Sequence, residues 1–170
     1  MESKLEPSPK KWLSIALSMK YITNATIIAS LVGYYTQAYW IFLVSIPLLI
    51  TNAIVITLLE WFNSYELTAA VLDIPISQPA LIKASQIKFT FINMIWHWIP
   101  LVWVWYILGK DDLIAVFRPN FMGCFLAGVV FGIGYFYFAS HGKYYGEIDY
   151  LWYMVVYVII LFTVCISVYG

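Results

Sequence analysis

Long runs of apolar residues, separated by short polar segments, occupy most of the chain from residue 12 to its end. Continuous apolar stretches of about 20 residues can cross the ~30 Å hydrocarbon layer of a bilayer as helices. The strands of a membrane barrel would alternate apolar and polar positions, and these runs do not alternate. The pattern therefore predicts an all-α, polytopic membrane protein with about five transmembrane helices in one bundle.

A polar tail at residues 1–11 is predicted to precede a single helical domain at residues 12–170. We expect spans at about 12–35, 39–61, 87–108, 120–139 and 150–169. The beginning of the first span is ambiguous, because residues 12–19 could instead lie along the membrane surface, so that the span starts near Lys20. The connection 63–86 is expected to form one short amphipathic turn or helix on the membrane surface, and its prolines favour a break in the chain.

Composition supports a membrane protein and restricts its partners. Of the 170 residues, 63% are hydrophobic and 11% are charged, whereas soluble domains carry about 25% charged residues. Nine basic and nine acidic residues cancel without forming a basic stripe, so the lipid bilayer is an expected partner and nucleic acid is not. No cluster has the spacing of a metal site and no glycine loop suits a phosphate, so neither a metal nor a cofactor is expected.

The distribution of basic residues predicts the orientation. With five spans and a cytoplasmic N-terminus, only Lys110 and Arg118 lie outside, as the positive-inside rule favours. The residues then inside are Lys4, Lys10, Lys11, Lys20, Lys83, Lys88 and Lys143. We expect a multi-pass protein of the endomembrane system. Gly128 and Gly132 form a G-x-x-x-G pair, which allows close helix–helix association.

His97 is the most informative single residue, because it lies near the middle of the predicted span 87–108. Ionisable groups at that depth are costly and usually face a bundle interior or a water-filled cavity. Asn93 precedes His97 by one turn, within reach of the imidazole or of the neighbouring backbone. The structural alternative is a neutral histidine that locks helix packing through a hydrogen bond. The acidic residues Glu60, Glu66 and Asp73 are expected to face water.

A second polar cluster lies at residues 20–24, where Lys20, Thr23 and Asn24 would share one helical face. If the first span begins at residue 12, Thr23 lies at the same depth as His97. A hydroxyl beside an imidazole is sufficient for nucleophilic acyl transfer, because the imidazole takes the proton and returns it to the leaving group. Lys20 or Asn24 could stabilise the oxyanion. Alternatively, the Thr23 hydroxyl bonds back to its own helix.

Several short segments resemble the androgen-induced and androgen-dependent membrane proteins. They are "KYIT" at residues 20–23, "FNSYELTAAVLD" at 62–73, "NMIWH" at 93–97 and the turn "HGKYYGEID" at 141–149. Met94 stands where the family motif has its first histidine. That family consists of intramembrane threonine hydrolases that cleave fatty acid esters of hydroxy fatty acids. The resemblance implies that Thr23 is the nucleophile and His97 the base.

Two functions of different classes follow from these observations. The first is an integral membrane hydrolase of lipophilic esters with Thr23 and His97 as catalytic residues, Asn93 orienting the imidazole, and Lys20 or Asn24 assisting the oxyanion. Its partner would be a lipophilic ester that enters sideways from the bilayer, and no cofactor would be needed. The second is a non-catalytic membrane scaffold or assembly subunit, in which His97 serves helix packing. A transporter is less favoured, because the predicted spans carry little charge.

Overall fold

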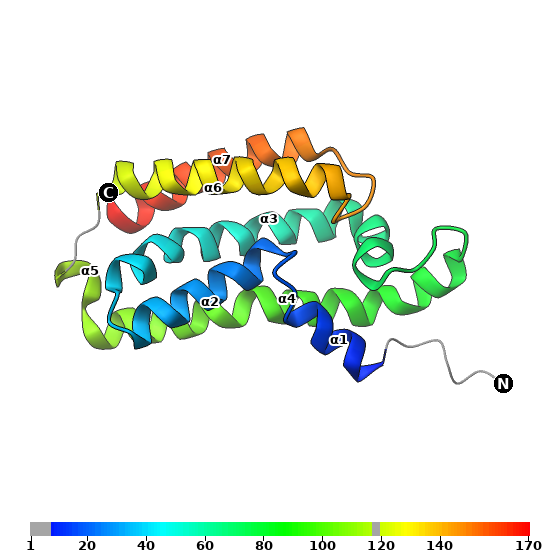
Figure 1. Ribbon diagram of the computed structural model, residues 1–170, viewed down its shortest axis with the longest axis horizontal. Helices are drawn as coiled ribbons and strands as arrows, with labels where there is room; N and C mark the ends of the chain where they lie inside the picture. Colours follow the sequence, from blue (N-terminus) through cyan, green and yellow to red (C-terminus); the bar gives the residue numbers. More distant parts are fainter. Residues whose placement is uncertain (1–7, 117–119) are drawn as a thin grey trace.

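The computed structural model describes residues 8–116 and 120–170, and within them the regular elements are helices joined by short segments (Figure 1). Figure 1 shows an elongated bundle in which α3 lies between the α6–α7 pair and the α2–α4 pair. The helices are α1 (Pro9–Ala16), α2 (Ile22–Tyr35), α3 (Tyr39–Leu72), α4 (Pro79–Asp111), α5 (Leu113–Val116), α6 (Phe121–Gly142) and α7 (Tyr150–Tyr169).

Four of the described helices, α3, α4, α6 and α7, are long and apolar enough to cross a membrane, which identifies an integral membrane protein. In α3, 67% of the most apolar stretch is buried, compared with at most 28% in the other three helices. Thus α3 is the centre of the bundle, whereas the other three leave apolar surface to face lipid. The expected number of about five spans is not confirmed, because α2, which belongs to the first predicted span, has only 14 residues.

The first predicted span, 12–35, is not one helix. α1 ends at Ala16, α2 begins at Ile22, and residues 17–21 between them are not helical. The side-chain amide of Asn24 stabilises this break, because its Nδ2 donates to the carbonyls of Ile15 (3.0 Å) and Ser18 (2.6 Å). The alternative start near Lys20 therefore lies closer to the observed boundary.

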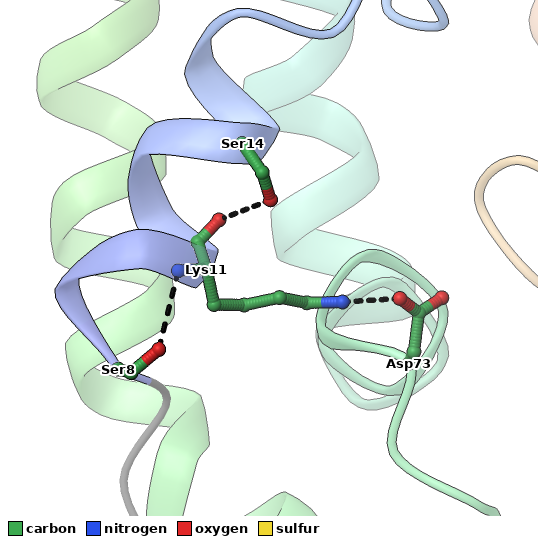
Figure 2. A network of polar contacts seen from close by, with 4 residues as sticks. All are labelled: Ser8, Lys11, Ser14 and Asp73. Carbon is green, nitrogen blue, oxygen red and sulfur yellow. Dashed lines mark hydrogen bonds and ion pairs between the residues drawn. The ribbon is translucent and has the colours of Figure 1, made fainter.

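The predicted tail 1–11 is shorter than expected, because α1 begins at Pro9 and residues 1–7 lie outside the described part of the chain. Figure 2 shows how α1 is held. The hydroxyl of Ser8 accepts the backbone N–H of Lys11 (3.3 Å), and the Ser14 hydroxyl donates to the Lys11 carbonyl (2.8 Å). The Lys11 ammonium forms an ion pair with the carboxylate of Asp73, at the end of α3. α1 is thereby attached to the loop that follows α3.

The prediction of a long connection at residues 63–86 is also wrong. α3 continues to Leu72 through a kink at Asn63 (φ −136°, ψ 30°), and α4 already begins at Pro79, so only residues 73–78 form a loop. Proline is well suited to the first turn of a helix, because the N–H that it lacks would have no partner there. The third predicted span, 87–108, is therefore the later part of a longer helix.

Glu60 does not face water as expected, because it lies on the side of α3 that packs against α4 and is 7% exposed. Its carboxylate accepts hydrogen bonds from the Thr90 hydroxyl (2.8 Å) and from Nδ2 of Asn93 (2.7 Å). Nearby, Nε2 of Gln86 donates to the Ser64 hydroxyl (2.8 Å). Charge-assisted bonds of this kind offset part of the cost of burying a carboxylate.

The two glycines of the G-x-x-x-G pair, Gly128 and Gly132, pack against another helix of the same chain. A Cβ built on Gly128 would lie 2.6 Å from a methyl carbon of Leu161, and one built on Gly132 would lie 2.2 Å from the ring of Tyr157. Both contacts are with α7, so the small residues allow α6 and α7 to approach closely. The bounds of α7 coincide with the predicted span 150–169, and α6 extends three residues beyond the predicted span 120–139.

Candidate functional site

Two cavities adjoin within the bundle. The smaller, of about 20 Å³, is lined by side chains of α2, α3, α4, α6 and α7 and by Tyr145. The larger, of about 320 Å³, lies between α1, the beginning of α2, α3 and α4. His97, Tyr145 and Ile56 line both cavities, so they form the boundary between them. A small cavity with several polar side chains in its wall thus lies beside a larger, mainly apolar one.

Thr23 and His97 both line the smaller cavity, although they come from α2 and α4. Their exposed fractions are 4% and 8%, respectively, so both are buried in the protein. Thr23 lies in the first turn of α2 and not in the middle of a long helix. The break at residues 17–21 allows a helix to begin at this level of the bundle, opposite the middle of α4 (Figure 1).

The imidazole of His97 is held by its own helix. Nδ1 lies 2.7 Å from the backbone carbonyl oxygen of Asn93. A carbonyl oxygen only accepts hydrogen bonds, so Nδ1 carries the proton. In the neutral ring Nε2 then has the lone pair, and a histidine in this tautomer can act as a general base through Nε2.

Asn52 and Tyr157 also line the smaller cavity, and each has one polar atom without a hydrogen-bond partner among the described residues. Asn52 Oδ1 and the Tyr157 hydroxyl are both buried, and neither has a hydrogen-bond partner among the described residues. The other end of the Asn52 amide is bonded, because Nδ2 donates to the Thr26 hydroxyl (3.1 Å). Asn52 therefore joins α2 to α3, as a buried amide can, and it also lines the smaller cavity.

The larger cavity has a mainly apolar lining, formed by aromatic and aliphatic side chains of α1, α3 and α4 and by Tyr21 and Tyr145. Pockets for small ligands commonly have about 300–1,000 Å³ and few polar groups. One wall is α1, from which Leu13 is 60% exposed, so the cavity lies close to the surface of the protein there. The indole N–H of Trp12 is a buried donor without a hydrogen-bond partner among the described residues.

The three supporting residues suggested by the sequence do not act together. Asn93 contributes its backbone carbonyl to His97, while its side chain bonds to Glu60. Asn24 lines the larger cavity, but Nδ2 bonds to carbonyls of the α1–α2 segment and Oδ1 accepts the indole N–H of Trp96 (2.7 Å). Both ends of its amide are therefore used in holding α1, α2 and α4 together.

Lys20 lies outside both cavity walls. It precedes α2, so it does not share a helical face with Thr23 and Asn24, as the sequence suggested. Its ammonium lies 5.0 Å from the ring centre of Tyr144 and 5.6 Å from that of Tyr21, which is a cation–π arrangement. The Lys20 carbonyl accepts the Tyr135 hydroxyl (3.1 Å).

Tyr145 adds a phenol to the boundary between the cavities. Its hydroxyl lies 2.6 Å from that of Tyr135, whose own proton is donated to Lys20, so Tyr145 is the donor of this pair. Burial raises the pKa of the Tyr145 hydroxyl well above its usual range. It therefore stays protonated and neutral around pH 7.

Sequence reasoning missed Tyr157, placed Glu60 in water and did not identify the unpaired oxygen of Asn52. Tyr157 carries no signal of its own in an apolar helix rich in aromatic residues, and the chain has 14 tyrosines. Glu60 stood out only as a charge within a predicted span. Asn52 could be recognised as a buried amide, but its unpaired oxygen depends on the bond between its nitrogen and Thr26.

Comparison of the chain with protein-family models, with curated proteins and with solved structures finds no match. Among the described residues, no group of three or more His, Cys, Asp or Glu side chains could hold a metal ion.

Proposed function

We propose that this protein is an integral membrane hydrolase of lipophilic esters, such as fatty acid esters, in which Thr23 is the nucleophile and His97 the general base. One observation carries the proposal: a buried hydroxyl and a buried imidazole, from two different helices, line one cavity next to a larger apolar one. The same pair is implied by the sequence resemblance to intramembrane threonine hydrolases.

In the acylation step, Nε2 of His97 takes the proton of the Thr23 hydroxyl while Oγ1 attacks the ester carbonyl. A bond forms between Oγ1 and the acyl carbon, and the bond from this carbon to the alkoxy oxygen breaks. The imidazolium gives its proton to the leaving alkoxide. The hydrogen bond from Nδ1 to the Asn93 carbonyl supports this role, because it keeps the lone pair on Nε2. The fatty acyl chain occupies the larger cavity.

We also propose that α1 and α2 together form a fifth, discontinuous span in an endomembrane. Discontinuous helices that meet within the bilayer are common at the binding sites of membrane transporters. The loops at residues 73–78 and 143–149 lie at one end of the bundle and α5 lies at the other (Figure 1). Most lysines lie toward the first end, which favours a cytoplasmic position for that end and for the beginning of α1.

Labelling with a lipophilic alkyl fluorophosphonate tests the catalytic pair. We expect the probe to modify residue 23, as located by mass spectrometry, and Thr23→Ala to abolish labelling while Thr23→Ser retains it. His97→Ala should slow labelling by about 10²–10⁴-fold, the usual contribution of a general base. The matched control is Thr51→Ala, because Thr51 is equally buried but lines neither cavity.

Labelling at another residue, or labelling of residue 23 at an unchanged rate in His97→Ala, would overturn the proposed pair. Absence of labelling and of ester hydrolysis in the folded wild-type protein would favour the scaffold alternative, in which His97 only packs α4. Circular dichroism of each variant in the same detergent separates a loss of chemistry from a loss of structure.

A further inference from the structure

We infer that Asn52 and Tyr157 bind one water molecule beside Thr23 and His97, and that this water hydrolyses the acylated Thr23. The inference rests on the proposed function and extends it, because it assigns the second half of the reaction to two residues of α3 and α7. Both residues line the smaller cavity and both are almost completely buried, with exposed fractions of 3% for Asn52 and 1% for Tyr157.

The orientation of the Asn52 amide follows from its neighbour. The Thr26 hydroxyl donates its single proton to backbone carbonyls of α2, at 2.9 Å from Thr23 O and 3.1 Å from Ile22 O. Its oxygen can therefore only accept from Asn52, which places the Nδ2 group of Asn52 on that side. Turning the amide around would bring two acceptors together. Oδ1 is consequently directed away from Thr26 and remains an acceptor that requires a donor.

The two unpaired atoms select water over a substrate carbonyl. Asn52 Oδ1 needs a donor, whereas the Tyr157 hydroxyl can donate or accept. A carbonyl oxygen only accepts, so it would leave Oδ1 unpaired. Water donates twice and accepts, which satisfies Oδ1 and the Tyr157 hydroxyl and leaves one proton for His97. The cavity of about 20 Å³ fits one water, since a single bound water needs at least ~10–15 Å³ of such space.

In the deacylation step, the water oxygen attacks the acyl carbon of the Thr23 ester, and Nε2 of His97 takes one water proton. A bond forms between the water oxygen and the acyl carbon, and the bond from Thr23 Oγ1 to this carbon breaks. The imidazolium then protonates Oγ1, so that the free threonine and a carboxylic acid are released. Asn52 and Tyr157 act by positioning the water.

The test follows hydrolysis of p-nitrophenyl decanoate by the full-length protein in detergent micelles. Rapid release of p-nitrophenolate reports acylation, and the later steady rate reports deacylation. For Tyr157→Phe, which removes only the hydroxyl, we expect an unchanged burst, a steady rate reduced at least tenfold, and decanoyl-Thr23 that accumulates in mass spectra. Asn52→Leu should show the same pattern. Tyr153→Phe is the matched control, because Tyr153 lies one turn away on α7 and bonds to Asn63.

The free energy of unfolding gives a readout that does not depend on activity. If no water binds, Tyr157→Phe removes an unpaired buried hydroxyl and should stabilise the protein. If water binds, the variant loses a bonded partner and should be less stable than wild type. An unchanged steady rate, an equal loss of burst and steady rate, or stabilisation by Tyr157→Phe would overturn the water site. A wild-type protein without acylation at Thr23 would instead overturn the proposed function, and with it this step.

Discussion

Replacing Gly132 by alanine tests the close contact between α6 and α7 on which the position of Tyr157 depends. The new Cβ would lie 2.2 Å and 2.7 Å from two carbons of the Tyr157 ring, whereas carbon atoms in ordinary contact are about 3.5–4.0 Å apart. The ring must therefore move by roughly 1 Å or more. It has little room to do so, because Tyr157 is 1% exposed and its ring packs edge-on against that of Phe136, with the two ring centres 5.5 Å apart.

The magnitude follows from two opposing effects. Overpacking of a tight core costs about 1–3 kcal/mol, whereas alanine in a helix is better than glycine by about 0.5–1 kcal/mol. We therefore expect Gly132→Ala to lower the free energy of unfolding by up to about 2.5 kcal/mol. Gly134 provides the control on the same helix, because nothing lies within 4 Å of its Cβ position. Gly134→Ala should be neutral or stabilising.

Reversible unfolding in mixed micelles with increasing dodecyl sulfate, followed by circular dichroism, measures both variants under one condition. The expected order of stability is Gly134→Ala, then wild type, then Gly132→Ala. Equal stability of the two variants, or stabilisation by Gly132→Ala, would mean that α6 and α7 do not pack through Gly132. The assay requires no knowledge of a substrate.

Two further pairs of variants can be compared in the same way. The Thr51 hydroxyl is buried without a partner among the described residues, whereas the Thr26 hydroxyl bonds to Asn52 and to the backbone. Thr51→Val should therefore raise the free energy of unfolding by about 1 kcal/mol, and Thr26→Val should lower it by about 1–2 kcal/mol. The reverse order of stability would refute the described bonds. Asn24→Leu removes both bonds to the α1–α2 segment and should speed amide hydrogen exchange in α1 by at least about tenfold. Lys11→Met removes a partly exposed ion pair worth at most about 1 kcal/mol, so the rate of amide hydrogen exchange in α1 should rise less than about fivefold. A larger rise than in Asn24→Leu would contradict the inference that Asn24 holds α1 more strongly than Lys11 does.

The helical membrane class could be predicted because it depends on composition and on the length of apolar runs. Helix ends were less predictable where side chains from other segments decide them. The break at residues 17–21 is held by the bond from Asn24 to the Ser18 carbonyl, whereas the sequence left open whether the first span begins at residue 12 or near Lys20. The polar residues beyond Trp61 predict a loop, but α3 continues to Leu72, and Ser64 there accepts a hydrogen bond from Gln86 of α4.

The candidate site was only partly visible in the sequence. Thr23 and His97 were paired by assuming one long helix from residue 12, and they line one cavity although that helix is broken. The placement of Thr23 depends instead on where α2 begins relative to α4. The unpaired oxygen of Asn52 and the hydroxyl of Tyr157 could not be found, because α3 and α7 come together only through tertiary packing.

The break before α2 also bears on how the protein is made. α2 has 14 residues and α1 has eight, so they measure about 21 Å and about 12 Å, less than the ~30 Å that a self-sufficient span requires. Among the described helices, α3 is the first in the chain that is long and apolar enough to leave the translocon on its own. Its partner α2 would follow it into the lipid as the second arm of a hairpin, so the helix that carries Thr23 integrates after a segment that is synthesised later.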